Sequence, residues 1–241
     1  QSTVLENINL RINKGENWVI LGANGSGKST LIKLFSHDLY PNTQYNFKKE
    51  IFGQDRWDIF ELKKYLGIIT NDLQNRFSAY GGQASGLSVV LSGYYSSLGT
   101  FQHHSFSKEQ IDNTLKVMDF LKITGLKDKN FSHMSTGEQR LCLIGRALVH
   151  EPEAFVLDEP TTGLDIRARN CFLKTLRNLS QKSSLILVTH NVEEIFPEIT
   201  HVALIHNKTI YKQGKKEDIL TSKNLSKIFR TNIELSIENN R

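Results

Sequence analysis

The chain has 241 residues, a length that fits one large α/β domain or one domain with a small inserted lobe. Hydrophobic residues make up 39% and charged residues 23% of the chain, a balance that excludes a disordered or fibrous protein. The formal net charge is +5, but the lysines are scattered in pairs rather than clustered, which favours a solvated surface over a nucleic-acid footprint.

The first predicted elements are a strand and a helix joined by a glycine-rich loop. The opening residues, QSTVLENINL, lack the basic and apolar stretches of a signal peptide. The apolar run Trp18–Leu21 predicts a strand that ends at Gly22, and residues 30–35 have helical spacing. No apolar run in the sequence approaches the roughly 20 residues of a membrane-spanning helix.

The loop between this strand and this helix has the phosphate-binding pattern G-x-x-x-x-G-K-S. Its glycines let successive backbone N–H groups face one concavity, and the helix adds its positive N-terminal end. Lys28 is expected to reach the β- and γ-phosphates of a nucleotide, and the Ser29 hydroxyl to bind Mg²⁺. The predicted nucleotide-binding residues of this loop are Gly22, Ala23, Asn24, Gly25, Ser26, Gly27, Lys28, Ser29 and Thr30.

The middle of the chain, roughly residues 75–135, is richer in Gly, Ser, Tyr and His than the rest. Lys108–Leu121 predicts an amphipathic helix, and no strand signal of comparable strength interrupts the region. We interpret it as a helical lobe inserted into a sheet domain. Phe77 and Tyr80, beside flexible glycines, suit a groove that contacts a partner helix, with the lobe's own core as the alternative place for such rings.

A helix start with two interpretations follows the lobe. Ser135 and Glu138 form the S-x-x-E capping box of an apolar helix over Leu141–Val149. Ser135 and Gly137 at this helix N-terminus would also make a second anion site. Within the helix, Cys142 is expected to be a buried free thiol. The two cysteines have neither metal-site nor disulfide spacing, which favours a reducing, cytosolic setting.

Three further apolar runs predict strands at residues 154–157, 185–188 and 202–205, with helical patterns over 140–149, 167–179 and 192–196. Runs without polar alternation are typical of strands covered on both faces, and their alternation with helices predicts a mostly parallel α/β sheet. At the end of the first of these runs, Asp158 is expected to hold Mg²⁺ and Glu159 to polarise an attacking water.

The segment MSTGEQRLCLIGRALVHEPEAFVLDEPTTGLD resembles the signature, Walker B and D-loop run of ABC ATPases, with Thr136 in place of the usual glycine. TTGLDIRAR and VTHNVEE are similar to the family's D-loop, with Asp165 in its acidic place, and to its switch region. The resemblance implies a single ABC ATPase domain over residues 1–241. It implies a phosphate-loop NTPase fold with a mostly parallel sheet core, an N-terminal antiparallel β subdomain from VLENINLRINKGE, and an inserted helical subdomain at roughly 75–135.

The resemblance also implies ATP and Mg²⁺ as cofactors and assigns site residues. His190 is expected to contact the γ-phosphate. The position of the family's Q-loop glutamine holds Asn71; we favour Gln74 for this role, with Asn71 as the rival. An adenine-stacking aromatic is expected before Val4, where only Gln1 to Thr3 stand, and Trp18 is expected in the core. The implied catalytic residues are Glu159, His190 and Gln74; the metal-binding residues are Ser29, Asp158 and Gln74; the signature residues that bind ATP are Ser135, Gly137 and Glu138.

In ABC ATPases the phosphate loop and the signature act on opposite faces of an ATP sandwich, so the resemblance implies a homodimer or a paired ABC subunit. VVLSGYYSSLGTF and EDILTSKNLSKIF are similar to molybdate-type and iron-chelate-type importer ATPases and their soluble relatives. The expected function is the cytoplasmic motor of a metal, oxyanion or chelate importer, peripheral at the inner face of the membrane with separate permease subunits. The alternative is a soluble, non-transport ABC ATPase. The third hypothesis is a nucleic-acid-directed ABC ATPase. It is disfavoured because the sequence shows neither a second cassette nor a long coiled coil, and no direct nucleic-acid contact is expected.

Overall fold

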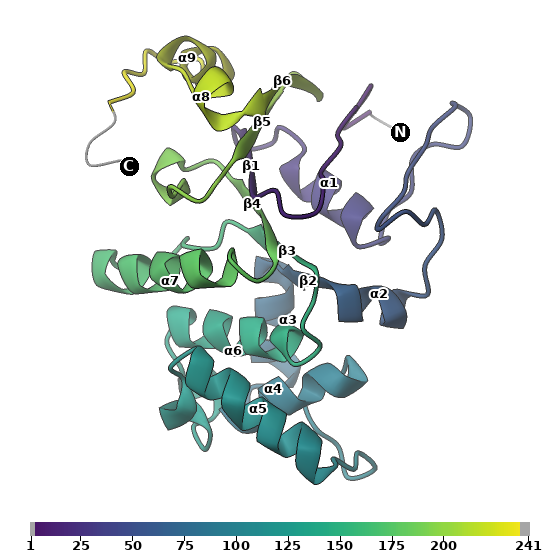
Figure 1. Ribbon diagram of the computed structural model, residues 1–241, viewed down its shortest axis with the longest axis vertical. Helices are drawn as coiled ribbons and strands as arrows, with labels where there is room; N and C mark the ends of the chain where they lie inside the picture. Colours follow the sequence, from purple (N-terminus) through teal and green to yellow (C-terminus); the bar gives the residue numbers. More distant parts are fainter. Residues whose placement is uncertain (1–2, 237–241) are drawn as a thin grey trace.

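A six-stranded sheet forms the centre of the computed structural model, which describes residues 3–236 (Figure 1). Its strand order is β2-β3-β4-β1-β5-β6; all neighbouring pairs are parallel except β5 and β6, which are antiparallel. The strands are β1 (Trp18–Gly22), β2 (Leu66–Ile69), β3 (Ala154–Asp158), β4 (Ser184–Thr189), β5 (His201–His206) and β6 (Thr209–Lys215). The expected α/β fold with a mostly parallel sheet is confirmed.

Helices connect and cover these strands. The α-helices are α1 (Lys28–Phe35), α2 (Ile59–Tyr65), α3 (Asn71–Tyr80), α4 (Gly86–Leu91), α5 (Lys108–Phe120), α6 (Thr136–Leu148), α7 (Ile166–Leu179), α8 (Lys216–Ile219) and α9 (Ser222–Phe229). Short 3₁₀ turns are η1 (Ser92–Tyr95), η2 (Thr124–Leu126), η3 (Phe131–His133) and η4 (Val192–Glu194). Within residues 3–236, no helix combines the length and the apolar character needed to cross a membrane.

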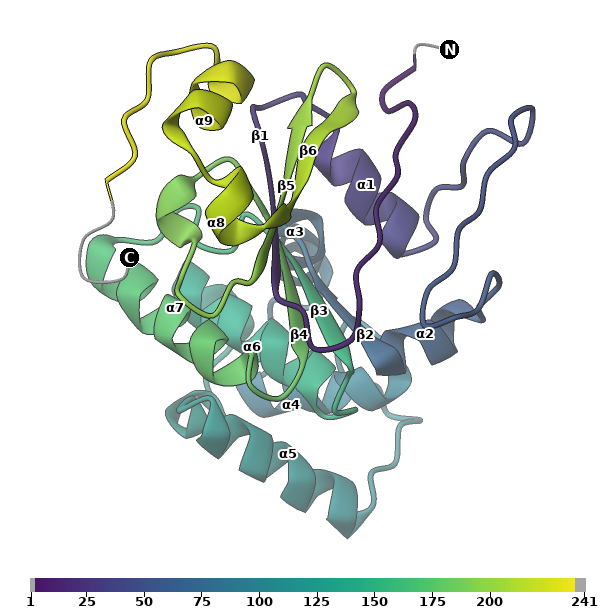
Figure 2. The ribbon, with the colours of Figure 1, turned by 45° about the horizontal axis from the view of Figure 1, so that its top comes forward.

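The two faces of the sheet pack against different helices, which explains the continuous apolar runs of its strands. Side chains of successive strand residues point to opposite faces. In β1, Val19 and Leu21 belong to the core shared with α6 and α7, while Trp18 and Ile20 belong to the core shared with α1 and α2. Figure 2 shows α1 and α2 on one side of the strands and α6 and α7 on the other. Helices therefore cover both faces of the sheet, and every residue of β1 and β4 is buried.

The chain between β2 and β3 is helical, and its helices α3 to α6 form the lower part of the molecule in Figure 1. The expected amphipathic helix is α5, which begins at the capping box of Ser107 and Gln110. Met118 of α5 and Phe131 of η3 are fully buried among the helices. The pattern of the middle region thus predicted a helical structure, and α6 leads directly back into the sheet through β3.

The N-terminal part of the expected fold takes a different form. Residues 3–17 contain no strand, so the antiparallel β structure expected there is absent from the described chain. The segment makes single hydrogen bonds to the β5–β6 hairpin. The Glu6 N–H donates to the carbonyl oxygen of Lys208 in the turn, and the Gln213 side chain of β6 donates to the Asn9 carbonyl oxygen. Its alternating apolar residues are instead half-buried against the core that contains α1: Leu5, Ile8, Leu10 and Ile12. Apolar packing holds this segment without a hydrogen-bonded ladder.

The helical pattern over residues 192–196 was wrong in extent. The structure has one 3₁₀ turn, η4, over Val192–Glu194. Pro197 disfavours the helical conformation at Phe196, which ends the turn early. The patterns over 140–149 and 167–179 are confirmed, although α6 and α7 begin at Thr136 and Ile166, one residue after their N-caps, Ser135 and Asp165.

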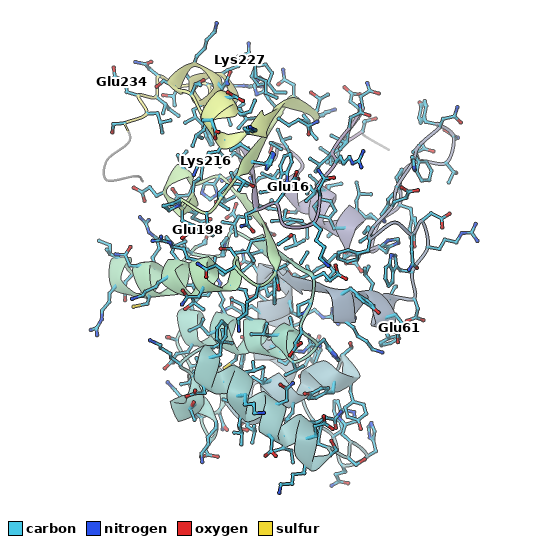
Figure 3. All side chains as sticks on the ribbon, in the orientation of Figure 1. Glu16, Glu61, Glu198, Lys216, Lys227 and Glu234 are labelled. Carbon is cyan, nitrogen blue, oxygen red and sulfur yellow. The ribbon has the colours of Figure 1, made fainter. Side chains whose placement is uncertain are left out.

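The charged side chains are spread over the surface (Figure 3). Lys64 pairs with Glu61 on α2 at 2.6 Å. Lys216, in the upper part of the molecule, donates to the carbonyl oxygen of Pro197. The labelled Glu61 and Lys216 lie far apart in Figure 3, so Lys64, which pairs with Glu61, and Lys216 belong to separate parts of the surface.

Candidate functional site

The parallel strands bring their carboxyl ends to one edge of the sheet. In open α/β sheets, loops at this edge form the ligand sites. β1 lies between β4 and β5, with Leu21 opposite Thr189 and Gly22 opposite Ile205. β3 is the other neighbour of β4. The three segments that leave this edge after Gly22, Asp158 and Thr189 carry most of the site residues that we expected from the sequence.

The phosphate-binding loop connects β1 to α1 in a tight turn. Gly25 and Gly27 have φ angles of +76° and +103°, a conformation that disfavours other residues. At Gly22 a Cβ atom would come within 2.5 Å of the Ser26 Oγ and 3.0 Å of the Ile205 carbonyl oxygen. The loop therefore keeps its curl only with glycine at these positions.

Lys28 lies at the first position of α1 and is buried under this loop. Its Nζ donates to the carbonyl oxygens of Gly22 at 2.9 Å and Ala23 at 3.2 Å. Burial lowers the pKa of Lys28, and the nearby carboxylates of Glu159 and Asp158 act in the opposite direction. The Ser26 hydroxyl is buried and has no hydrogen-bond partner in the described chain. A buried cation, an unsatisfied hydroxyl and a glycine loop at a helix start fit a phosphate group.

The acidic pair lies at the end of β3: Asp158 is its last residue, and Glu159 follows it. Burial raises the pKa of Asp158 to about 6, and the charge of Glu159 acts in the same direction. Glu159 has a left-handed backbone with φ +45°, and its N–H donates to the Val188 carbonyl oxygen of β4 at 2.8 Å. Its Oε1 lies 3.9 Å from the Lys28 Nζ. Carboxylate and hydroxyl oxygens are the ligands that Mg²⁺ takes alongside phosphate oxygens, so Asp158 and the exposed Ser29 fit this ion.

His190 follows β4 directly and completes the group. Its Nδ1 lies 2.7 Å from the Glu159 Oε1, and its side chain is 40% exposed. The Thr162 hydroxyl donates to the other Glu159 oxygen at 3.3 Å. The structure thus brings together four of the expected residues, Lys28, Asp158, Glu159 and His190, from three separate strand ends.

Gln74 and Asn71 have a different set of contacts. Gln74 is buried within α3, where its Nε2 donates to the Gln139 Oε1 at 2.7 Å and its Oε1 accepts from the Arg140 Nε at 3.1 Å. The Asn71 Oδ1 accepts from the Arg140 Nη2 at 2.8 Å. Both expected candidates for the Q-loop role are therefore bonded to α6 rather than to Lys28, Asp158 or His190.

The signature residues form the start of α6. Ser135 is the N-cap, and its Oγ accepts from the Glu138 N–H at 3.3 Å while Glu138 accepts from the Ser135 N–H at 2.7 Å, so the expected capping box is confirmed. Burial acts to raise the pKa of Glu138, but the hydrogen bonds from Lys129 and Ser135 lower it. Across residues 3–236, no hydrogen bond joins Ser135, Gly137 or Glu138 to the loop of residues 22–30. The two predicted phosphate-binding parts are thus separate within one chain.

The aromatic residues divide between core and surface. Trp18 is buried, donates to Glu16 and stacks on His201, as expected for a core residue. Phe77 is completely buried beside Phe131, with ring centroids 5.6 Å apart, so the expectation that it contacts a partner is wrong. It belongs to the face of α3 that packs into the lobe.

The remaining aromatic expectations differ in outcome. Tyr80, three residues after Phe77 on α3, is 80% exposed, and its contact with a partner stays a prediction. The expected place of an adenine-stacking ring before Val4 falls partly on residues 1–2, which lie outside the described residues. The separate expectation of a buried free thiol at Cys142 is confirmed, and burial raises the pKa of this thiol to about 12.

Sequence reasoning assigned no role to three residues that hold the turn after the acidic pair: Arg140, Thr161 and Glu194. Arg140 donates to the Pro160 carbonyl oxygen at 2.7 Å, and Glu194 accepts from both the N–H and the hydroxyl of Thr161. All three lie inside segments that resemble family motifs, but the local sequence does not indicate their partners, which lie on distant parts of the chain. The one available signal was composition: Arg140 and Glu194 are charged residues beside apolar ones in segments that must pack closely.

The sequence of this chain is similar to those of ABC transporter ATP-binding proteins over most of its length. A family model described as ABC transporter matches residues 5–162. A putative ABC transporter ATP-binding protein of Streptococcus mutans is 31% identical over 99% of this chain and 91% of its own length. The molybdate import ATP-binding protein MolC of Haemophilus influenzae is 30% identical over 95% and 83%. The zinc uptake system ATP-binding protein ZurA of Listeria monocytogenes is 32% identical over 88% and 80%.

Two solved structures have similar folds. An inward-facing conformation of a putative metal-chelate type ABC transporter superposes with a TM-score of 0.75 and 25% identity, over 94% of this chain and 82% of that one. The cbiO1 protein of Clostridium perfringens, part of the ABC transporter complex cbiONQ, gives a TM-score of 0.76 and 26% identity, over 93% and 86%.

Proposed function

The chain belongs to the ABC transporter family as an ATP-binding and ATP-hydrolysing subunit with Mg²⁺, and we propose that it energises import of a metal, oxyanion or chelate through separate permease subunits. The observation that carries the ATPase part is the meeting of Lys28, Asp158, Glu159 and His190 at one edge of the sheet. The import part is supported by relatives named for molybdate import and zinc uptake.

We assign the nucleotide-binding roles as follows. The backbone of residues 22–30 holds the phosphates, and Lys28 offers its charge to the β- and γ-phosphates. Ser29 and Asp158 hold Mg²⁺, which when bound neutralises charge on the phosphates. Without a bound ion, burial raises the pKa of Asp158 to about 6, so this carboxyl is mostly ionised at neutral pH.

The hydrolytic roles fall to the residues on either side of the attacking water. Glu159 orients this water and accepts its proton, so that the oxygen attacks the γ-phosphorus in line and the bond to the β-phosphate oxygen breaks. We assign His190 to the γ-phosphate, and its Nδ1, 2.7 Å from the Glu159 Oε1, supports a place in the same site. We assign Gln74, with Asn71 as the rival, to the sensing of the metal and water from α3.

Each ATP site requires a second copy in this proposal. The chain acts as one ATPase domain over residues 1–241, with the helical subdomain at roughly 75–135. Ser135, Gly137 and Glu138 of one copy complete the site formed by the phosphate loop of another, or of a paired ABC subunit. The separation of these two parts within one chain supports this arrangement. ATP binding closes the dimer, and hydrolysis reopens it.

The proposal places the chain on the cytoplasmic side of the membrane, at the inner face, when it is assembled with permease subunits. Affinity purification of the tagged chain from detergent-solubilised membranes of its own organism tests this directly. We expect multi-spanning membrane subunits to copurify, and uptake of molybdate, zinc or an iron chelate to stop in cells that carry only Glu159→Gln. Wild-type ATPase activity without any copurifying membrane subunit would overturn the import proposal in favour of a non-transport ABC ATPase.

A further inference from the structure

The peptide bond between Pro160 and Thr161, one residue beyond Glu159, is hydrogen-bonded from two sides. Its carbonyl oxygen, on Pro160, accepts from the Arg140 Nη1 at 2.7 Å. Its N–H, on Thr161, donates to the Glu194 Oε1 at 3.1 Å, and the Thr161 hydroxyl donates to the same oxygen. One peptide thus uses both of its polar groups on charged side chains from different elements. We call this arrangement the Pro160–Thr161 clamp.

The members of the clamp are almost inaccessible to water. Arg140 is 4% exposed, Thr161 4% and Glu194 1%. Hydrogen bonds to charged groups are stronger at low dielectric, and the loss of one partner leaves the other charge buried and unpaired. Burial lowers the pKa of Arg140, while the carboxylates of Glu194, Glu159 and Asp158 act to raise it. The guanidinium is therefore stabilised by the negative charges of the site as well as by its hydrogen bonds.

Arg140 also connects the clamp to α3. Its Nη2 donates to Asn71 at 2.8 Å, and its Nε donates to Gln74 at 3.1 Å. A guanidinium has five N–H donors in a fixed plane, so one side chain can hold three acceptors in a defined geometry. These three bonds connect the first turn of α3 to the turn after Glu159 through one guanidinium.

The backbone conformation of Glu159 explains why it needs such support. Its φ of +45° is left-handed, which is unfavourable for a non-glycine residue and persists only where the surrounding contacts hold it. The N–H of Glu159 donates to β4, and the Pro160–Thr161 peptide that follows this residue is held by the clamp. The segment that carries the carboxylate is thus held on both sides of this residue.

We propose that Arg140 and Glu194 are positioning residues for the hydrolytic step, which hold Glu159 through the Pro160–Thr161 peptide and couple its position to Asn71 and Gln74 on α3. Glu194 lies in η4, four residues after His190, so the clamp joins the three segments that carry Asn71, Glu159 and His190. The inference rests on the proposed role of Glu159 in hydrolysis. Neither Arg140 nor Glu194 is required to touch the nucleotide.

Arg140→Lys tests the clamp, because a lysine keeps the charge but cannot hold Asn71, Gln74 and Pro160 together. Loss of position at Glu159 should lower kcat between about tenfold and a hundredfold. The KM for ATP should stay within about twofold of the wild-type value, because the phosphate loop is untouched. Hydrogen exchange of nucleotide-free protein should become faster in residues 158–165, whose amides include the Thr161 N–H held by Glu194.

Arg146→Lys is the matched control. Arg146 lies on the same helix, is also deeply enclosed and holds Ser92 and Ser97 in the lobe, without contact to the turn after Glu159. This variant should speed exchange around residues 92–97 and leave kcat and residues 158–165 unchanged. If Arg140→Lys does not fold, Glu194→Gln serves instead: it keeps an acceptor for Thr161, removes the charge that faces Arg140, and should show the same split between kcat and KM.

Several results would overturn the clamp. One is that Arg140→Lys changes neither kcat nor hydrogen exchange in residues 158–165. Another is that Arg140→Lys loses activity because the KM for ATP rises while kcat stays the same. The third is that Arg146→Lys lowers kcat as much as Arg140→Lys does. Failure of the proposed function is separate. If Glu159→Gln retains wild-type turnover, the role of Glu159 falls together with the catalytic part of the inference, whereas absence of a permease partner leaves the clamp and its tests untouched.

Discussion

Lys28 shows how one buried charge can prepare a site for an anion. Its ammonium group is enclosed by the loop and bonded to two carbonyl oxygens, which supply partial rather than full negative charge. Lys28→Ala should weaken ATP binding between about tenfold and a hundredfold, since a hydrogen bond to a charged group contributes about 1.5–3 kcal/mol. Calorimetric titration of ATP measures the change. Lys33→Ala, an exposed position of the same helix, is the control and should bind as the wild type does.

A second prediction at this scale concerns pH. Burial raises the pKa of Asp158 in the folded protein to about 6, above the ordinary value of 3.8. The folded state therefore holds a proton that the unfolded state has lost between these two values, and the stability from Asp158 decreases as the pH rises from about 4 to 6. Asp158→Asn, which has no such charge, should raise the Tm without nucleotide or Mg²⁺ most strongly above pH 6.

Thermal melts of wild type and Asp158→Asn from pH 4 to pH 8 provide the measurement. The gap between the two Tm values should narrow as the pH falls below about 6 and stay constant above it. A gap of the same size at every pH would show that the burial of this carboxylate has no energetic consequence. Asp165→Asn, at the exposed N-cap of α7, controls for the loss of an acidic side chain.

At the scale of elements, α3 separates a core aromatic from a surface aromatic within one turn. Phe77 is completely buried, whereas Tyr80 is 80% exposed. Phe77→Ala should lower the free energy of unfolding by about 3–5 kcal/mol, as expected for a large ring lost from a core. Tyr80→Ala should change it by no more than about 0.5 kcal/mol. Urea unfolding of both variants checks the pair, and equal costs would contradict the assignment of α3's faces.

The strands and the N-terminal segment show which parts of this structure can be predicted from the sequence alone and which cannot. The apolar runs of β1, β3, β4 and β5 were found because a strand buried on both faces leaves a continuous signal. The N-terminal segment has the alternation of a strand but no ladder, because apolar packing alone satisfies its side chains. Local pattern does not reveal whether a neighbouring backbone lies in register, and this is why the expected antiparallel part took another form.

The same limit applies to the site. The loop of residues 22–30 and the acidic pair could be predicted because the residues that form each of them are consecutive in the sequence. The clamp could not, since Arg140 and Asn71 lie 69 positions apart and meet only in the folded chain. Gln74 shows the intermediate case: its type and position suggested the site, while its observed partners are Gln139 and Arg140 on α6.

At the scale of the whole molecule, the phosphate loop and the signature belong to different halves of the proposed dimer. A chain with Lys28→Ala and a chain with Ser135→Arg are each defective on one half only. In a mixed dimer one site combines both defects, while the other combines the intact loop of one copy with the intact signature of the other. An equal mixture should therefore recover roughly a quarter of wild-type ATPase activity, if half of the dimers are mixed and each has one working site.

Ser135→Arg needs its own control, because Ser135 also caps α6. Loss of an N-cap costs about 0.5–2 kcal/mol and could lower activity through stability alone. Ser107→Arg removes the equivalent cap of α5, which also has a capping box, at a position outside the proposed site. It should lose a similar amount of stability and keep its activity. No recovery in the Lys28→Ala and Ser135→Arg mixture, with mixed dimers demonstrated by differently tagged chains, would mean that each copy hydrolyses ATP alone.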